Sequence, residues 1–180
     1  AGARQGAAYL AEHGYRQVGF IGSKQYWGDY AFEGVEKGLA DYGLSLAPER
    51  VVRIGETYQE GFRGASVLLE RDAYCDAVFL DSDMRALGAL ECLRQAGVRV
   101  PQDLALMGYY GLENATSQPP FLTSVKVPYA AMIRAALSEV EKRAGGGTPR
   151  KHLSFIGDVL PGRTCAVAEP EKAATSASKG

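Results

Sequence analysis

The chain has 180 residues, of which 46% are hydrophobic and 23% are charged, and its formal net charge at pH 7 is -1. This balance is typical of a globular domain, and it provides neither the basic surface that nucleic acid requires nor the run of about 20 apolar residues that spans a membrane. The three cysteines, Cys75, Cys92 and Cys165, are scattered and odd in number, which favours free thiols in a reducing compartment.

Apolar residues recur by turns at helix and strand spacing along almost the whole chain. In chain order we expect a helix over 1–13, a strand over 18–21, a helix over 29–42, a strand over 51–54, a helix over 57–71, a strand over 77–80, a helix over 83–95, strands over 104–107 and 122–127, a helix over 128–144, and short strands over 151–156 and 158–160. This alternation predicts an α/β fold with an open, mostly parallel sheet and helices on both faces. The composition of residues 169–180 predicts a disordered tail.

Capping and glycine signals support these boundaries. Asp29 and Asp83 stand where N-caps are expected, and Thr57 with the glutamate three residues later forms a capping box. Gly34 and Gly38 leave one face of the second helix flat enough for close backbone approach.

Residues 76–111 read as one complete strand, helix and strand unit. Two strands joined by a helix are expected to be parallel, with a right-handed crossover. Their carboxyl ends then lie at the same edge of the sheet, which brings Ser82 and Asp83 beside Tyr110. Ligands bind at that edge in open α/β sheets, so these three residues are candidate ligand contacts.

Tyr26 and Trp27 are two large aromatic residues in an expected loop, where amphipathic packing does not require them. They could plug the edge of the sheet or stack on a ligand, and the sequence leaves both interpretations open. We interpret Asp83 primarily as a helix cap, with ligand contact as an additional role. His152 has no cysteine or histidine at ligand spacing, so neither a metal site nor a cofactor is expected.

Four segments occur in a characteristic order: LAEHGYRQVGFIG (10–22), EGVEKGLADYGL (33–44), DAVFLDSDMRALGALECLRQAGVRVPQDLALMGYYG (76–111) and PPFLTSVKVP (119–128). Together they resemble the effector-sensing region of the lactose/galactose-repressor (LacI/GalR) family of bacterial transcription regulators, a type I periplasmic-binding-protein-like fold. The resemblance implies a two-lobed sensor with a small-molecule effector between the lobes, a homodimer, and a separate helix-turn-helix domain for operator DNA.

The resemblance also implies how the chain is divided. Residues 1–168 are expected to form the effector-binding and dimerisation domain, mainly its C-terminal lobe, with helix 128–144 belonging to an N-terminal lobe that this chain lacks. The helix-turn-helix is expected to be absent as well, so operator DNA would be bound only through a domain outside this chain.

Three pocket positions depart from the family pattern. Ala31 stands where an Arg is usual, Ser82 where an Asn is frequent, and Tyr110 where an Asp commonly follows Gly-Tyr. Loss of the Arg removes the strongest bidentate donor, which favours a sugar-like or aromatic effector recognised by stacking. The predicted ligand contacts are Tyr26, Trp27, Tyr30, Ala31, Ser82, Asp83 and Tyr110, and the resemblance implies a dimer interface containing Phe62, Met84, Leu87 and Gln118.

Two other functions stay open. A periplasmic-type sugar-binding protein would share the fold, although the expected absence of a signal peptide and the free cysteines count against it. FLDSD resembles the aspartate pair of haloacid-dehalogenase-type phosphatases, in which Asp81 would attack phosphorus, Asp83 would protonate the leaving group and both would share Mg²⁺. That chemistry needs a further acidic pair, and only Asp158 stands in the turn available. We therefore expect a non-catalytic cytoplasmic sensor that does not associate with a membrane.

Overall fold

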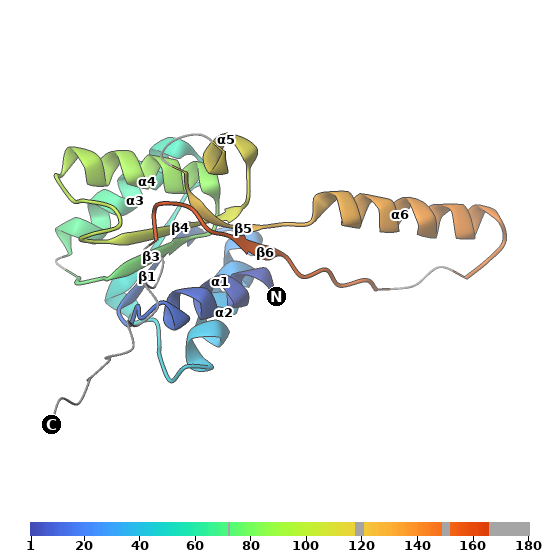
Figure 1. Ribbon diagram of the computed structural model, residues 1–180, viewed down its shortest axis with the longest axis horizontal. Coiled ribbons are helices and arrows are strands. Elements are labelled where there is room, and N and C mark those ends of the chain that lie inside the picture. Colours follow the sequence, from blue (N-terminus) through green and yellow to red (C-terminus); the bar gives the residue numbers. More distant parts are fainter. Residues whose placement is uncertain (72, 118–120, 149–151, 166–180) are drawn as a thin grey trace, which may run out of the picture.

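The computed structural model describes residues 1–71, 73–117, 121–148 and 152–165. Its centre is a six-stranded sheet in the order β2-β1-β3-β4-β5-β6 (Figure 1). The strands are β1 (Val18–Ser23), β2 (Val51–Ile54), β3 (Ala77–Leu80), β4 (Ala105–Tyr110), β5 (Thr123–Lys126) and β6 (Asp158–Leu160). The first five strands pair in parallel and β6 is antiparallel, which confirms the predicted mostly parallel sheet. The predicted tail over 169–180 lies outside the described residues.

Helices cover both faces of this sheet, as predicted (Figure 1). One layer consists of α1 (Gly2–Glu12) and α2 (Tyr26–Ala40), and the other of α3 (Tyr58–Glu70) and α4 (Asp83–Gln95). The short helices η1 (Pro48–Arg50) and α5 (Glu113–Thr116) precede β2 and follow β4. The predicted helix over 128–144 is present as α6 (Tyr129–Ala144), which extends away from the sheet (Figure 1).

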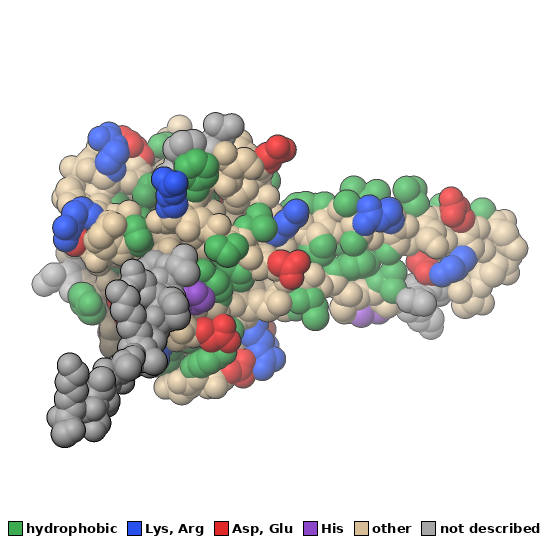
Figure 2. Space-filling model, in the orientation of Figure 1, with side chains coloured by type: hydrophobic (Ala, Val, Ile, Leu, Met, Phe, Trp, Pro, Cys, Tyr) green, Lys and Arg blue, Asp and Glu red, His purple; other side chains and the backbone are tan. Residues whose placement is uncertain are grey.

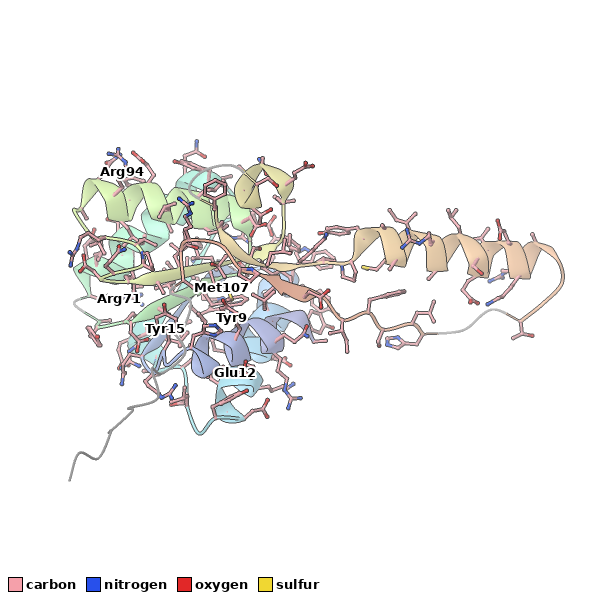
Figure 3. All side chains as sticks on the ribbon, in the orientation of Figure 1. Tyr9, Glu12, Tyr15, Arg71, Arg94 and Met107 are labelled. Carbon is pink, nitrogen blue, oxygen red and sulfur yellow. The ribbon has the colours of Figure 1, made fainter. Side chains whose placement is uncertain are left out.

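The core has two apolar layers because successive side chains of a strand point to opposite faces. Phe20, Phe79 and Met107 pack toward α1 and α2, whereas the next or preceding strand residues, such as Ile21 and Leu80, pack toward α3 and α4. Figure 3 shows Met107 in the sheet and Tyr9 on the helix layer beneath it. The central strands are therefore buried on both faces, which explains their continuous apolar sequence.

Glycines bring the helices of each layer into close contact. A Cβ atom on Gly38 would lie 2.4 Å from the carbonyl oxygen of Arg4 in α1, so the predicted close approach at Gly34 and Gly38 is confirmed. The other layer uses the same device, since a Cβ atom on Gly88 would lie 2.0 Å from the carbonyl oxygen of Tyr58.

Two predicted helix caps are wrong. Helix α2 begins at Tyr26 with Gln25 as N-cap, so Asp29 lies inside its first turn and Tyr26 and Trp27 belong to the helix rather than to a loop. Helix α4 begins at Asp83 with Ser82 as N-cap, and the Asp83 side chain does not cap it. The cap at Thr57 is confirmed, because its hydroxyl oxygen accepts a hydrogen bond from the Glu60 N–H at 3.2 Å.

Helix α4 is buried mainly through small residues. Small residues, among them Ala86, Gly88 and Ala89, face the sheet and α3, while Met84 is 38% exposed. Close packing on α3 leaves no room for a row of large side chains on that face. The strand expected over 151–156 is not formed by the described residues 152–156.

The contact at Gly38 predicts the effect of a single methyl group. Ala normally stabilises a helix interior relative to Gly by up to about 1 kcal/mol. At Gly38 the added Cβ collides with the backbone of α1, so we expect Gly38→Ala to lower the free energy of unfolding by about 1 to 3 kcal/mol. Urea unfolding measures this change. Gly145→Ala, where the nearest atom is 3.6 Å away, is the control, and a stabilising Gly38→Ala would contradict the packing.

Candidate functional site

Polar and aromatic side chains gather at the carboxyl edge of the sheet. Strands β3 and β4 pair in parallel with Phe79 opposite Met107, so Ser82 follows β3 at the edge where Tyr110 ends β4. The predicted parallel pairing is therefore confirmed. Arg71 and Arg94 mark the opposite edge. Arg71 directly follows α3 and Arg94 lies in the last turn of α4, far from α6 (Figure 3).

Asp83 joins the first turn of α4 to two other segments at this edge. Its carboxylate accepts a hydrogen bond from the Ser124 hydroxyl at 2.5 Å and another from the Leu112 N–H at 2.6 Å. The side chain is completely buried, and Gly108 lies so close that a Cβ atom there would be 2.3 Å from Asp83 Oδ1. Asp83 thus fixes the position of β3 and α4 relative to β5 and the loop after β4.

Asp81 and Arg85 form a buried ion pair directly after β3. Asp81 Oδ1 lies 2.6 Å from Arg85 Nη2, and the two side chains are 3% and 5% exposed. The other carboxylate oxygen accepts a hydrogen bond from the Ser23 N–H at 2.8 Å. Burial raises the pKa of Asp81, and the Arg85 guanidinium and the Ser23 N–H oppose that rise. Sequence reasoning missed Arg85, although an acid and a base four residues apart are visible in the sequence.

Tyr110 adopts a backbone conformation that L-residues rarely adopt, with a φ angle of 103°. Its side chain is half-buried, and burial together with the charges of Asp81 and Glu56 raises the pKa of its hydroxyl. Strained residues of this kind cluster at ligand sites. Tyr110 therefore lies beside the ion pair, at the end of β4, in a conformation typical of functional positions.

A surface pocket lies next to Tyr110. It has a volume of about 350 Å³ and lies where β5 leads into α6, with Tyr110, Lys126, Tyr129 and Arg134 among its lining residues. A volume of this size is at the lower end of the range that small-molecule sites occupy.

Exposed aromatic rings stand at the start of α2, the helix that follows β1 at the same edge of the sheet. Tyr26, Trp27 and Tyr30 are each more than half exposed, so the interpretation that Tyr26 and Trp27 plug the sheet edge is wrong. The Tyr26 ring packs edge-on against Tyr30, with centroids 4.6 Å apart, and the two hydroxyls are hydrogen-bonded. Ala31 is buried in the apolar layer beneath them, so its methyl group offers little surface to a ligand.

Arg53 and Glu56 also have polar partners at this edge. The Arg53 guanidinium bonds the carboxylate of Asp29 and lies 5.5 Å from the centroid of the Phe32 ring. The Ser23 hydroxyl donates to Glu56 Oε1 at 3.2 Å. Arg53 and Arg85 thus each have a carboxylate of their own, Glu56 adds one more negative charge, and Lys126 and Arg134 add positive charges in the pocket next to Tyr110.

The residues of the predicted dimer interface lie on the outer helix layer. Phe62 is on α3, Met84 and Leu87 are on α4, and these helices pack directly against each other. Gln118 lies outside the described residues. The structure contains a single chain, so their role in a dimer stays a prediction.

Helix α6 carries a row of exposed apolar side chains. No residue of α6 is buried, and Figure 2 shows hydrophobic side chains along it. The large ones are Tyr129, Met132, Ile133, Leu137 and Val140. Among the residues that the structure describes, no helix is both long enough and apolar enough to cross a membrane.

Comparison with known proteins identifies the family to which this fold belongs. Residues 7–165 match the periplasmic binding protein-like domain, and the chain belongs to that family. The chain is 31% identical over 170 residues to the HTH-type transcriptional repressor MelR of Bacillus subtilis, covering 90% of this chain and 49% of that protein. It is 35% identical over 150 residues to the HTH-type transcriptional regulator CelR of Thermobifida fusca, covering 82% and 44%.

A solved structure supports the same relationship. The transcriptional regulator CelR-cellobiose complex aligns with a TM-score of 0.81 and 31% identity, over 91% of this chain and 51% of that one. The resemblance to LacI-family regulators is thereby confirmed. The chain spans about half the length of the curated relatives that it matches.

The raised pKa of the Asp83 carboxyl group predicts that the stability of the fold depends on pH. Burial raises the pKa of Asp83 to about 6, above the ordinary value of 3.8, so the folded protein binds this proton more tightly than the unfolded chain. Its contribution to stability is therefore complete below about pH 4 and is lost as the pH rises through about 6. A shift of two pKa units corresponds to about 3 kcal/mol.

The test compares Asp83→Asn with the unsubstituted chain by urea unfolding at about pH 4 and about pH 7. The Asn side chain has no proton to release, so the variant should gain up to about 3 kcal/mol relative to the parent over this interval. All other carboxyl groups are common to both proteins and cancel. A stability difference that does not change with pH would show that Asp83 is not the group responsible.

Proposed function

We propose that this chain is the effector-sensing and dimerisation region of a LacI-type bacterial transcription regulator, with residues 1–168 as its domain. A small molecule would bind at the carboxyl edge of the sheet, between the aromatic rings of α2 and Tyr110. The proposal rests on one observation. The exposed aromatic rings of α2, the strained Tyr110 and the buried ion pair of Asp81 and Arg85 all lie at the edge where open α/β sheets bind ligands. Operator DNA would be bound by a part of the protein that these 180 residues do not include.

A sugar-like effector fits this edge best. Tyrosine and tryptophan rings offer apolar faces together with a polar group, which suits a ligand that has both hydroxyl groups and C–H faces. The aligned CelR structure is a complex with cellobiose, which supports a carbohydrate for the present chain as well. A planar aromatic effector is the second candidate, since it would stack on the same exposed rings.

Catalysis is not part of the proposed function. A phosphatase would need Asp81 and Asp83 to share a cation, but Asp81 is bonded to Arg85, and Asp83 is bonded to Ser124 and to the Leu112 N–H. Within the described ranges, no group of three or more His, Cys, Asp or Glu side chains could hold a metal ion. Both carboxylates therefore have structural partners in place of a metal.

A cytoplasmic location follows from the proposed role, because a regulator must reach DNA. The curated relatives include HTH-type transcriptional regulators and repressors, which favours this role over that of a periplasmic transport protein. The same relationship supports a homodimer formed through the outer faces of α3 and α4. The apolar face of α6 would then be covered by the other lobe of the sensor.

Ligand binding is tested by calorimetry on the full product of the gene that encodes this chain, with a panel of mono- and disaccharides, purines and aromatic acids. We expect Trp27→Ala and Tyr110→Ala each to weaken binding of the best ligand by about tenfold or more, because each removes a stacking surface. Tyr74→Ala, a similarly exposed tyrosine before β3 at the opposite edge, is the control. Unchanged binding in both site variants would remove the proposed pocket.

The dimer face is tested by sedimentation. Met84→Glu places an unpaired charge on the outer face of α4, which should shift the protein toward monomer by at least about tenfold in dissociation constant. Met84 is already partly exposed, so the fold itself should tolerate this change. Tyr74→Glu serves as the matched control. A Met84→Glu protein that stays as dimeric as the control would place the interface elsewhere.

A further inference from the structure

The outer side of β2 is an open edge of the sheet. Strand β2 stands first in the sheet order, and among the strands of the described residues it pairs with β1 alone. The Lys24 N–H donates to the carbonyl oxygen of Ile54 at 3.1 Å, so the backbone of Ile54 faces β1. Because successive residues of a strand direct their N–H and C=O groups to opposite sides, Val51 and Arg53 direct theirs outward. An open row of backbone groups of this kind can pair with a further strand.

A pocket of about 300 Å³ lies along this edge and is lined by residues of both β2 and α3. Val52 and Ile54 contribute apolar side chains to it, and both belong to the apolar layer on the α3 side of the sheet. The second wall is one face of α3 and the position directly after it, where the lining residues recur every three or four positions: Glu60, Arg63, Val67 and Arg71. A strand added to β2 would therefore lie beside this charged face of α3.

Cationic side chains predominate in the lining of this pocket. Four are cations and one is a carboxylate, namely Lys24, Arg53, Arg63, Arg71 and Glu60. Arg53 is bonded to Asp29, and Arg63 lies 3.6 Å from Glu60 with its own side chain 73% exposed. Within the described part of the chain, neither Lys24 nor Arg71 belongs to an ion pair. Even with Asp29 counted, cations exceed carboxylates by two.

Other carboxylates of this region are directed elsewhere. Glu56 accepts a hydrogen bond from the Ser23 hydroxyl at 3.2 Å, and Glu70 accepts one from the Ser66 hydroxyl at 2.9 Å. Glu49, in the short helix before β2, does not line the pocket, and neither do the other two. The excess of positive charge is therefore local to the open edge.

Arg71 bonds the backbone of β2 where a carboxylate could take its place. Its Nη1 group donates to the carbonyl oxygen of Val51 at 2.8 Å. A carboxylate is a stronger acceptor for a guanidinium than a neutral carbonyl. A partner's carboxylate can therefore take over the Arg71 guanidinium while an N–H of the partner's backbone bonds Val51 instead. This exchange leaves no polar group without a hydrogen bond.

The same charges decide which strand can add here. Two copies of β2 placed edge to edge would bring the cations of both copies together, and like charges across a strand pair are destabilising. Alternate side chains of an added strand point to the same face of the sheet. Carboxylates on alternate residues would therefore all reach the α3 side, where Arg63 and Arg71 stand.

We propose that the outer edge of β2 is a docking site for an acidic, extended segment of a partner protein, which adds to the sheet as a further strand and places carboxylates beside Lys24, Arg63 and Arg71. The backbone of Val51 and Arg53 supplies hydrogen bonds that any extended segment can use, and the cations select acidic side chains. This site is independent of the proposed effector site, because it uses neither the rings of α2 nor Tyr110.

The test measures binding of fluorescein-labelled peptides to the full gene product by fluorescence polarisation at low salt. A short peptide of alternating threonine and glutamate should bind with a dissociation constant of about 100 μM or lower. The same peptide with lysine in place of glutamate should bind at least about tenfold more weakly. A third peptide keeps every glutamate but has proline in place of the central threonines, which removes backbone N–H groups and prevents strand pairing. It should also bind at least about tenfold more weakly.

A charge-reversal variant separates recognition at β2 from attraction to the protein as a whole. Lys24→Glu combined with Arg63→Glu changes two exposed side chains of the pocket. It should lose at least about tenfold in affinity for the glutamate peptide and gain affinity for the lysine peptide. Lys37→Glu, an exposed cation of α2 outside the pocket, is the matched control and should bind as the unsubstituted protein does. Circular dichroism establishes that each variant is folded.

The contrary outcomes are distinct. Absence of binding by the glutamate peptide would overturn the docking site and would leave the effector-sensing function untouched. Equal binding of the proline peptide would exclude strand addition, and equal binding of a single-stranded oligothymidylate would indicate a surface for nucleic acid instead. These peptide comparisons use the unsubstituted protein, so they decide the matter even if the charge-reversal variant does not fold. A folded charge-reversal variant that binds the glutamate peptide as tightly as the Lys37→Glu control would also overturn the proposal.

Discussion

The buried carboxylate of Asp83 is the interaction on which the carboxyl edge depends. It joins the start of α4 to the Ser124 hydroxyl of β5 and to the Leu112 N–H after β4, so three segments that are distant in sequence meet at one side chain. Gly108 has no side chain, which leaves the space that this carboxylate occupies. Because α4 is held in this way, Arg85 and Tyr110 are brought to adjacent positions at the edge.

The carboxyl edge combines a buried ion pair with exposed aromatic side chains. Asp81 and Arg85 are nearly inaccessible and fixed by several hydrogen bonds, whereas the rings of Tyr26, Trp27 and Tyr30 remain largely open to solvent. Because the ion pair is already formed, its side chains need little reorganisation when a ligand binds, and the exposed rings supply apolar contact area. A fixed ion pair beside exposed rings is better suited to reversible binding of a small polar molecule than to catalysis.

The sequence predicts the sheet and the helix layers because each depends on local signals. The central strands are continuous apolar runs, and the glycines at positions 34 and 38 of the second helix mark its contact with α1. The role of Asp83 could not be predicted in this way. An aspartate before a helix is most often a cap, and its actual partner, Ser124, lies 41 residues further along the chain.

The burial of Arg85 could not be predicted from the sequence either. An acid and a base four residues apart form a solvent-exposed pair on most helices, as Lys37 and Glu33 do in α2. Only the packing of α4 against α3 and the sheet makes the pair of Asp81 and Arg85 a buried one. The aromatic residues of α2 were recognisable as unusual from the sequence, but whether they plug the edge or face solvent depended on where the helix begins.

Binding of a small molecule at the carboxyl edge of this sheet can be measured by hydrogen–deuterium exchange of the full gene product, with and without the sugar that binds it most tightly. We expect slower exchange of the backbone amides around residues 23–31, 81–86 and 108–113, where the chain passes the proposed ligand. Protection confined to the opposite edge, around residues 73–76 and 97–104, with no change at the carboxyl edge, would contradict ligand binding at the carboxyl edge.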